Sequence, residues 1–144
     1  MTHAITPAAP ADLPAILELL AASKLPRAGI EDHVASTLVA RADSNVVGSA
    51  ALELYGSAAL LRSVAVATRL RGRGLGAALT VAALDLARRS GVRTVYLLTE
   101  TAGRFFPKFG FAAIARAEVD PVVLESPEFT TACPKSALVM VKQL

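Results

Sequence analysis

The sequence predicts an α/β fold with one mixed central sheet, and three observations lead to this prediction. Apolar residues recur at helical spacing over 75–88, and a compact β-branched run spans 94–99. The apolar runs between 37 and 67 are separated by the turn sequences Asp43-Ser44-Asn45 and Gly56-Ser57. Tight turns join antiparallel strands, whereas a helix between two strands is a crossover that joins parallel neighbours. The expected order of elements is β-α-α-β-β-β-α-β-α-β-β.

The first quarter of the chain predicts one strand and two helices. Residues 3–6 form a short strand, after which Asp12 and Pro14 supply a helix cap and a first-turn proline. The helical spacing of apolar residues that follows stops just before the next proline, so the first helix is expected over 12–23. A second, short helix is expected over 30–36.

The remainder of the chain supplies the other strands and helices. Arginines in the last turn and a glycine just beyond it close the helix over 75–88. A helix over 101–109 contains Pro107, which is tolerated only in a first turn, so this helix is expected to start near 104–106 or to bend. The other expected strands are 37–40, 46–55, 58–67, 94–99, 111–117 and 137–142, with a long proline-containing segment at 118–136.

Composition predicts one domain, 1–144, without a membrane span or a metal site. Hydrophobic residues make up 53% and mean hydropathy is +0.50, but charge or glycine interrupts every apolar stretch before the roughly 18 residues that a span needs. One cysteine and two histidines cannot assemble a zinc cluster. The first residues lack a basic segment followed by an apolar core, so we expect no secretory signal and a cytoplasmic location.

The charge pattern distinguishes one turn from the rest of the chain. The net charge is +3, and Arg69, Arg71 and Arg73 alternate within one short stretch, which concentrates positive potential there. This pattern predicts an anionic ligand. Nucleic acid is not an expected partner, because no broad basic stripe is present and aromatic residues make up only 5%.

The segment Arg71-Gly72-Arg73-Gly74-Leu75-Gly76 leads into the helix over 75–88. The first N–H groups of a helix lack intrahelical partners and carry the positive end of its dipole, so a phosphate placed there gains several hydrogen bonds. The alternating glycines would line the ligand side, while Leu75 anchors the helix in the core. The segment therefore predicts a pyrophosphate site.

Three other interpretations compete with a pyrophosphate site in this segment. An ATP-binding P-loop requires Gly-Lys-Ser/Thr, which the chain lacks. The pattern Gly72-x-Gly74-x-x-Ala77, with Glu100 after the next strand, matches a relaxed dinucleotide fingerprint. Against this match, residues 67–71 separate the glycines from the preceding strand, and the chain has only one crossover. An ordinary strand-to-helix turn does not account for the alternating arginines.

The pattern Arg71-x-x-Gly74-x-Gly76 resembles the hallmark of the GCN5-related N-acetyltransferase (GNAT) superfamily, Arg/Gln-x-x-Gly-x-Gly/Ala at the start of the third helix. The resemblance extends to the strand 62–67 and to the motif Phe-Phe-Pro-Lys-Phe-Gly-Phe at 105–111, and the element order agrees over nearly the whole chain. More narrowly, the stretches 60–66, 95–99 and 133–137 resemble a subgroup associated with arsenic-resistance operons.

The resemblance implies acetyl-CoA as cofactor and direct transfer, in a ternary complex, to the amine of a small molecule such as an amino acid or an arsenic-containing analogue. Cofactor and substrate would enter from opposite faces of a slot, where the strands that carry Val66 and Leu98 splay apart. An N–H near Val64 would stabilise the oxyanion. The expected cofactor-binding residues are Val64, Val66, Arg71, Gly72, Arg73, Gly74, Leu75, Gly76, Ala77, Phe106 and Lys108.

Acetyl transfer to an amine needs a base, and Glu53 and Glu100 are the candidates. Glu53 lies in an apolar run that is expected to raise its pKa, and Glu100 lies at the end of a strand. A solvent-facing glutamate is the alternative for each. Arg62 interrupts an apolar strand, so it either points into the slot to bind a substrate carboxylate or oxyanion, or lies at the exposed face of the sheet.

Many relatives place a tyrosine, proposed to protonate the leaving thiolate, where this chain has Phe106. Tyr55 or Tyr96 could replace it, or the thiolate, with a reference pKa of about 8.5, leaves unassisted or takes a proton from water. Cys133 could act in a ping-pong mechanism or bind arsenic, and His33 could face the substrate. The alternatives are a small buried hydrophobe and a surface or hydrogen-bonded helix histidine.

The missing tyrosine also keeps a second hypothesis open, a non-catalytic acetyl-CoA-binding sensor or interaction module. The acceptor pocket is expected between the first two helices and the segment 118–136, as a small, partly hydrophobic site. A small apolar domain of this kind is compatible with a homodimer. The apolar residues of these regions are Leu25, Ile30, Val122, Val123, Leu124 and Phe129.

Overall fold

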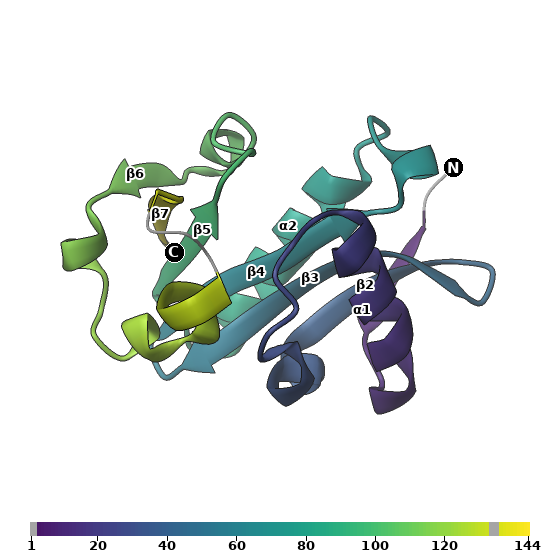
Figure 1. Ribbon diagram of the computed structural model, residues 1–144, viewed down its shortest axis with the longest axis horizontal. Helices are drawn as coiled ribbons and strands as arrows, with labels where there is room; N and C mark the ends of the chain where they lie inside the picture. Colours follow the sequence, from purple (N-terminus) through teal and green to yellow (C-terminus); the bar gives the residue numbers. More distant parts are fainter. Residues whose placement is uncertain (1–2, 133–135) are drawn as a thin grey trace.

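The computed structural model describes residues 3–132 and 136–144. One seven-stranded mixed sheet, with strand order β1-β2-β3-β4-β5-β7-β6, runs through the molecule (Figure 1). The strands are β1 (Ala4–Pro7), β2 (Thr37–Ala42), β3 (Asn45–Tyr55), β4 (Ala58–Val66), β5 (Thr94–Thr99), β6 (Ala112–Ile114) and β7 (Leu138–Gln143). The α-helices are α1 (Leu13–Ala22) and α2 (Leu75–Arg89). The predicted mixed α/β fold is confirmed.

The two α-helices cover opposite faces of the sheet (Figure 1). Each strand can contact both helices, because its successive side chains point to opposite faces. On β2, Leu38 and Ala40 pack in the cluster that contains Leu79 of α2, whereas Val39 between them packs in the cluster that contains Ile16 of α1. Each face therefore buries its own apolar layer, and the removal of these layers from water is the main force that holds the helices on the sheet.

The neighbours β4 and β5 are parallel and are connected through α2, as predicted. Their pairing covers only 58–60 against 94–96, although both strands continue further. On its other edge, β5 stays paired with β7 along its whole length. The sheet therefore opens between β4 and β5 alone, beyond Leu60 and Tyr96, and the predicted separation of these strands is confirmed.

A β-bulge in β4 lies beside this opening. Ser49 pairs with Ala65 and Ala51 pairs with Arg62, so two residues of β4, 63 and 64, lie opposite one residue of β3. Ser63 takes up the irregularity with a left-handed φ of 60°, and the Ser49 hydroxyl donates a 2.7 Å hydrogen bond to its carbonyl oxygen. A bulge re-aims the groups around it.

The predicted helix over 30–36 is not an α-helix. It is the 3-10 turn η2 (Ile30–Ser36), with a kink at His33, whose φ is −125°. The hydroxyls of Ser36 and Thr37 both donate to the His33 carbonyl oxygen, at 3.3 and 2.7 Å. Side-chain donors of this kind compete with the main-chain ladder of an α-helix, which explains the tighter turn.

Two further elements are shorter than predicted. The helix expected over 101–109 is reduced to the 3-10 turn η4 (Phe106–Phe109), with Pro107 in its first turn as anticipated. The strand expected over 111–117 is only β6, because Phe111 turns into the core and a 3-10 turn, η5 (Arg116–Glu118), follows. As the last strand of the sheet, β6 has only β7 as a neighbour.

The segment after η5 packs against the sheet face opposite α2. It contains the 3-10 turn η6 (Val123–Glu125) and the π turn η7 (Glu128–Ala132), and Val123 and Phe129 are buried against Leu60 and Tyr96. The segment thus closes one side of the region where β4 and β5 separate. Among the described helices, none has the length and apolarity that a membrane crossing requires.

Candidate active site

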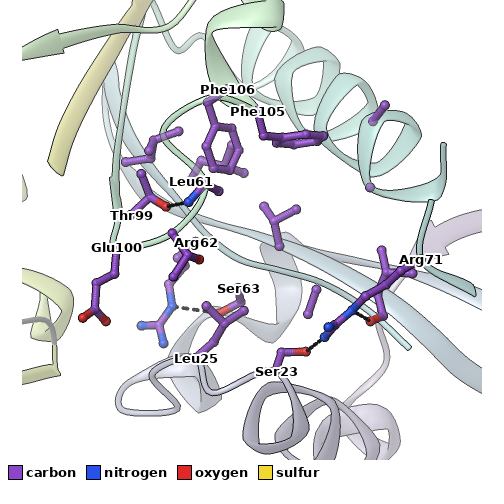
Figure 2. A pocket seen from close by; sticks show the side chains of 18 of the residues that line it. Ser23, Leu25, Leu61, Arg62, Ser63, Arg71, Thr99, Glu100, Phe105 and Phe106 are labelled. Atoms are coloured by element: carbon purple, nitrogen blue, oxygen red, sulfur yellow. Dashed lines mark hydrogen bonds between the residues drawn. The ribbon is translucent and has the colours of Figure 1, made fainter. Parts of the chain in front are cut away.

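A cavity of about 770 Å³ opens where β4 and β5 separate. Small-molecule sites typically span roughly 300–1,000 Å³. Figure 2 shows Arg71 on one side of this cavity and Glu100 on the other. We call the side at 71–77 the glycine end and the side at Arg62 and Glu100 the glutamate end. The lining residues lie within 23–26, 61–66, 70–77 and 97–108, and include Glu128.

The glycine end presents main-chain N–H groups to the cavity. The first hydrogen bond of α2 runs from the Ala78 N–H to the Gly74 carbonyl oxygen, at 3.0 Å. Among the described residues, no main-chain or side-chain acceptor pairs with the N–H groups of 72–77. Gly72 and Gly74 have φ values of 79° and 83°, and a Cβ on either would meet nothing within 4 Å. These donors are therefore open to a ligand.

The core holds the glycine end from behind. The Leu75 side chain is buried in the same cluster as Leu79, as predicted. A Cβ on Gly76 would lie 3.7 Å from both Phe105 and Val66, in ordinary van der Waals contact. Packing thus holds the N–H groups of Leu75 and Gly76 in position, which reduces the entropy lost on binding.

Three cations were predicted at the glycine end, and the structure brings two of them to the cavity. Arg71 lines it, but the guanidinium folds back to donate to the Val66 carbonyl oxygen at 3.2 Å and to the Ser23 hydroxyl at 3.3 Å. Lys108 also lines it, with its Nζ 5.7 Å from the centre of the Phe105 ring. Arg73 is exposed and is not among the lining residues.

The other predicted cofactor residues border the same space. Val64 and Val66 line the cavity along the bulged part of β4, and Phe106 lines it from η4 as a buried apolar wall. The unpaired N–H groups, the two cavity cations and this apolar strand edge together fit a diphosphate with an extended apolar arm. The donor set therefore suits a coenzyme A molecule.

At the glutamate end, the Arg62 side chain is fully buried. Its Nη1 donates to Glu53 Oε2 at 2.8 Å and to the Ala28 carbonyl oxygen at 2.7 Å. Its Nη2 donates to the Pro26 carbonyl oxygen at 3.2 Å, and its Nε donates to the Ser63 hydroxyl at 3.1 Å. Arg62 is buried and lines the cavity, so the exposed orientation is wrong, but protein acceptors already take four of its five N–H groups.

Glu53 lies behind Arg62 and is not among the residues that line the cavity. Burial disfavours its charged form, yet hydrogen bonds from Tyr55, Arg62 and Ser126, together with the Arg62 charge, outweigh burial and lower the pKa of Glu53. The expectation of a raised pKa is therefore wrong. Its apolar neighbours in sequence favour a raised pKa, but the ion-pair partner on the next strand, Arg62, acts in the opposite direction.

Neither tyrosine considered as an acid lines the cavity. The Tyr55 hydroxyl donates to Glu53 Oε1 at 2.5 Å, and burial and this hydrogen bond raise the pKa of Tyr55 above its ordinary value. Tyr96 is buried in the cluster under η6. His33 does not line the cavity either, and its Nε2 lies 3.9 Å from Glu53 Oε1. Cys133 falls outside the described residues.

Glu100 follows β5 directly, is exposed and lines the cavity. It is the predicted carboxylate that the fold brings to the site. Glu128 of η7 also lines the cavity, is 4% exposed, and places Oε2 3.7 Å from Arg62 Nη2. No motif singled out Glu128, because it lies in an irregular segment that reaches the site only through the tertiary fold.

Both regions that were expected to shape the acceptor pocket contribute residues to the cavity lining, but most of their apolar residues do not. Leu25 lines the cavity, next to Pro26, and the segment 118–136 contributes Glu128. The other five apolar residues do not line it, and three of them are buried in core clusters instead. The lining on this side is therefore more polar than expected. These five residues are Ile30, Val122, Val123, Leu124 and Phe129.

Several solved structures share this fold. N-acetylglutamate synthase from Neisseria gonorrhoeae, complexed with coenzyme A and N-acetyl-glutamate, superimposes with a TM-score of 0.85 at 22% identity, over 100% of this chain and 35% of that chain. This chain therefore spans about a third of that synthase. The Rv2747 protein of Mycobacterium tuberculosis, in complex with CoA, superimposes with a TM-score of 0.82 at 25% identity, over 98% of this chain and 99% of that chain. Ard1 from Thermoplasma volcanium superimposes with a TM-score of 0.78 at 24% identity, over 100% of this chain and 99% of that chain.

The sequence itself carries the family assignment. No curated protein matches it. Residues 33–113, more than half of the chain, match the family model described as the acetyltransferase (GNAT) domain. This match confirms the predicted superfamily, and two of the solved structures named above contain coenzyme A. The chain therefore belongs to the GNAT acetyltransferase family.

Proposed function

We propose that this chain is an acetyl-CoA-dependent N-acetyltransferase that acts on the amine of a small molecule by direct transfer between two bound substrates. The observation that carries the proposal is the set of unpaired N–H groups at 72–77, on the wall of a cavity whose opposite end contains Glu100. One end suits a diphosphate and the other a basic group, which are the two requirements of this reaction.

The cofactor would lie along β4 with its diphosphate at the glycine end. The N–H groups of 72–77 would hold the diphosphate, and Lys108 would add a positive charge beside it. The main chain of Val64 and Val66 would pair with the pantetheine arm, because the separation of β5 leaves this edge of β4 without a neighbouring strand. Phe106 of η4, across the cavity from β4, would exclude water from the pantetheine arm.

When bound, acetyl-CoA supplies an activated thioester. The contribution of the chain at the carbonyl is an N–H donor near Val64, at the bulge beside the opening. A fixed main-chain donor that faces a developing oxyanion typically lowers the barrier by about 3 kcal/mol. A donor at the bulge would serve the reacting carbonyl between the two ends of the cavity.

Glu100 is the proposed base, acting directly or through one water. An alkylammonium must lose a proton before it can attack, and a carboxylate in the cavity can accept it. Glu53 is not suited to this role, because its carboxylate is bound by Arg62 and Tyr55 behind the cavity wall. No tyrosine of the described residues lines the cavity, so the thiolate is proposed to leave unassisted or to take its proton from water.

An amino acid is the proposed acceptor class. Two opposite charges, Lys24 and Glu100, line the cavity, and within the described part of the chain neither belongs to an ion pair. A zwitterionic acceptor would complement both. An arsenic-containing amino acid belongs to this class and agrees with the resemblance of 60–66 and 95–99 to the arsenic-resistance subgroup.

Release of free thiol from acetyl-CoA tests the proposal, with a panel of amino acids, arsenic-containing amino acids, aminoglycosides and polyamines. The expected result is acceptor-dependent release with at least one amino acid. Tight binding of coenzyme A without release for any amine would instead support a non-catalytic sensor. A rise in melting temperature with nicotinamide or flavin nucleotides, and none with coenzyme A, would contradict the assignment of the glycine end.

A further inference from the structure

Protein acceptors take most of the hydrogen-bond donors of the Arg62 guanidinium. Of its five N–H groups, four donate to protein acceptors at 2.7–3.2 Å. Glu128 lies 3.7 Å from Nη2, the nitrogen that already donates to Pro26. Four of the five donors thus bind the protein itself, and the nitrogen that carries the fifth is paired in charge with Glu128, so the structure favours a role in holding the chain over a direct role in binding the acceptor.

The acceptors of Arg62 tie together segments that are far apart in the sequence. Pro26 and Ala28 belong to the connection between α1 and η2, Glu53 belongs to β3, and Glu128 belongs to η7. Two of these segments, 23–29 and 126–128, line the cavity beside Arg62 through Pro26 and Glu128. We call them the two wall segments. The Arg62 guanidinium thus interacts with both wall segments.

The two wall segments also touch each other above the guanidinium. A Cβ on Gly29 would lie 2.9 Å from Pro127 Cγ and 3.6 Å from Arg62 Nη1. Gly29 has a φ of 81°, so this close approach uses both its missing side chain and its left-handed backbone. One wall segment therefore rests on the other, with Arg62 below the contact.

We propose that Arg62 is a positioning residue, which fixes the two wall segments and so sets the shape of the site for the acceptor amine. The inference rests on the proposed function, because the glutamate end is taken as the acceptor side. Arg62 acts through Pro26, Ala28 and Glu128 and does not touch the substrate. The guanidinium is essential to this role, because its five N–H groups point outward in one plane and can bind several separate acceptors. A lysine ammonium is a compact charge and cannot bind all of them at once.

Trypsin cleavage of the folded protein tests the attachment. Lys24 and Arg27 are exposed and lie inside the first wall segment, so cleavage after them reports its local opening. We expect Arg62→Lys to accelerate cleavage at these two sites by roughly tenfold or more, with cleavage after Arg89 unchanged. The matched control is Arg41→Lys, which alters a two-point pair with Asp12, at 2.7 and 3.0 Å, outside the cavity.

A second pair of variants leaves Arg62 intact. Gly29→Ala places a methyl group against Pro127, whereas Gly56→Ala adds one at a similar φ of 70° with nothing within 4 Å. Both variants strain a left-handed glycine, but only Gly29→Ala separates the two wall segments. Faster cleavage after Lys24 and Arg27 is expected for Gly29→Ala alone.

Steady-state kinetics with the best acceptor of the amine panel separates positioning from general destabilisation. In Arg62→Lys, the KM for this acceptor should rise roughly tenfold, while the Kd for coenzyme A changes by less than about twofold. Unchanged cleavage and unchanged acceptor KM in both Arg62→Lys and Gly29→Ala would overturn the inference. A wild-type chain that binds no coenzyme A would instead refute the proposed function, and the cleavage comparison would still decide the role of Arg62.

Discussion

The two ends of the cavity differ in which groups form them, main-chain N–H groups at one end and buried charged side chains at the other. At the glycine end, residues 71–74 are exposed, and the groups that face the cavity are main-chain N–H groups. At the glutamate end, Arg62, Glu53 and Glu128 are at most 4% exposed, and their side chains bond to one another and to nearby carbonyl oxygens. One end is built from backbone geometry and the other from buried side-chain charge.

This difference predicts how each end responds to substitution. Main-chain donors persist when a neighbouring side chain is changed, so the glycine end should tolerate loss of its arginines and fail only when its N–H groups are occupied. A buried ion pair leaves an uncompensated charge when one partner is removed. The glutamate end should therefore be sensitive to each member, in stability as well as in activity.

The largest effect is expected for Glu53→Gln, which leaves Arg62 without its closest carboxylate. Removing one partner of a buried pair costs about 3–5 kcal/mol. The pKa of folded Glu53 is lowered from the ordinary value of 4.5, so its contribution to stability is present above that value and is lost as pH falls through the folded pKa. Urea unfolding should show a gap between wild type and variant that is widest at neutral pH and narrows in acid.

The matched control for this prediction is Glu18→Gln, because Glu18 lies on the exposed face of α1. Its free energy of unfolding should stay within about 0.5 kcal/mol of wild type at every pH. A Glu53→Gln gap that stays constant from neutral to acid pH would contradict an ionised Glu53 in the folded protein.

The second effect is on catalysis. Glu100→Gln should lower kcat by about a hundredfold, because general bases typically contribute 10²–10⁴-fold. The Kd for coenzyme A should not change, since Glu100 lies across the cavity from Arg71 (Figure 2). Initial rates of thiol release measure kcat, and calorimetric titration measures the Kd for coenzyme A. Full activity of Glu100→Gln, with that of Glu18→Gln as reference, would remove Glu100 from the mechanism.

The third effect is on cofactor affinity alone. Gly74 is the N-cap of α2, so the carboxylate of Gly74→Asp should compete for the N–H groups and repel phosphate, while the φ of 83° adds backbone strain. The Kd for coenzyme A should rise roughly thirtyfold, about 2 kcal/mol. Gly56→Asp is the control, because Gly56 also has a positive φ and open space. Equal affinities of the two variants would contradict the assignment.

The smallest effect is expected for Arg71→Ala. The Arg71 side chain is exposed and already bonded to Val66 and Ser23, and exposed charge pairs contribute about 0.2–1 kcal/mol. The Kd for coenzyme A should rise by no more than about fivefold. A loss as large as that of Gly74→Asp would mean that side chains, rather than the main chain, hold the phosphates at this end.

The glycine end was predictable because its determinants are local. Unpaired N–H groups follow from the start of a helix, and alternating glycines mark the open side, so one short segment contains the whole argument. Glu100 was predictable for a similar reason, because the end of β5 places it at the opening. The 3-10 character of η2 was not, since it depends on where the Ser36 and Thr37 hydroxyls find acceptors.

The glutamate end was predictable only in part. The tight turn at Gly56-Ser57 pairs Glu53 with Leu60, which puts Arg62 on the same face, two residues further along β4. This hairpin register is a signal that could have identified the Glu53–Arg62 pair and the lowered pKa of Glu53. The carbonyl acceptors of Pro26 and Ala28 and the carboxylate of Glu128 come from irregular segments, which no periodic pattern places.

The N–H groups of 72–77 are proposed to bind the diphosphate of the cofactor. Nuclear magnetic resonance of the ¹⁵N-labelled chain, titrated with coenzyme A and separately with pantetheine, measures each of these groups directly. Coenzyme A should shift the amide signals of 72–77, and pantetheine, which lacks the diphosphate, should shift only those near Val64 and Val66. Saturation with coenzyme A while the signals of 72–77 stay in place would contradict the account.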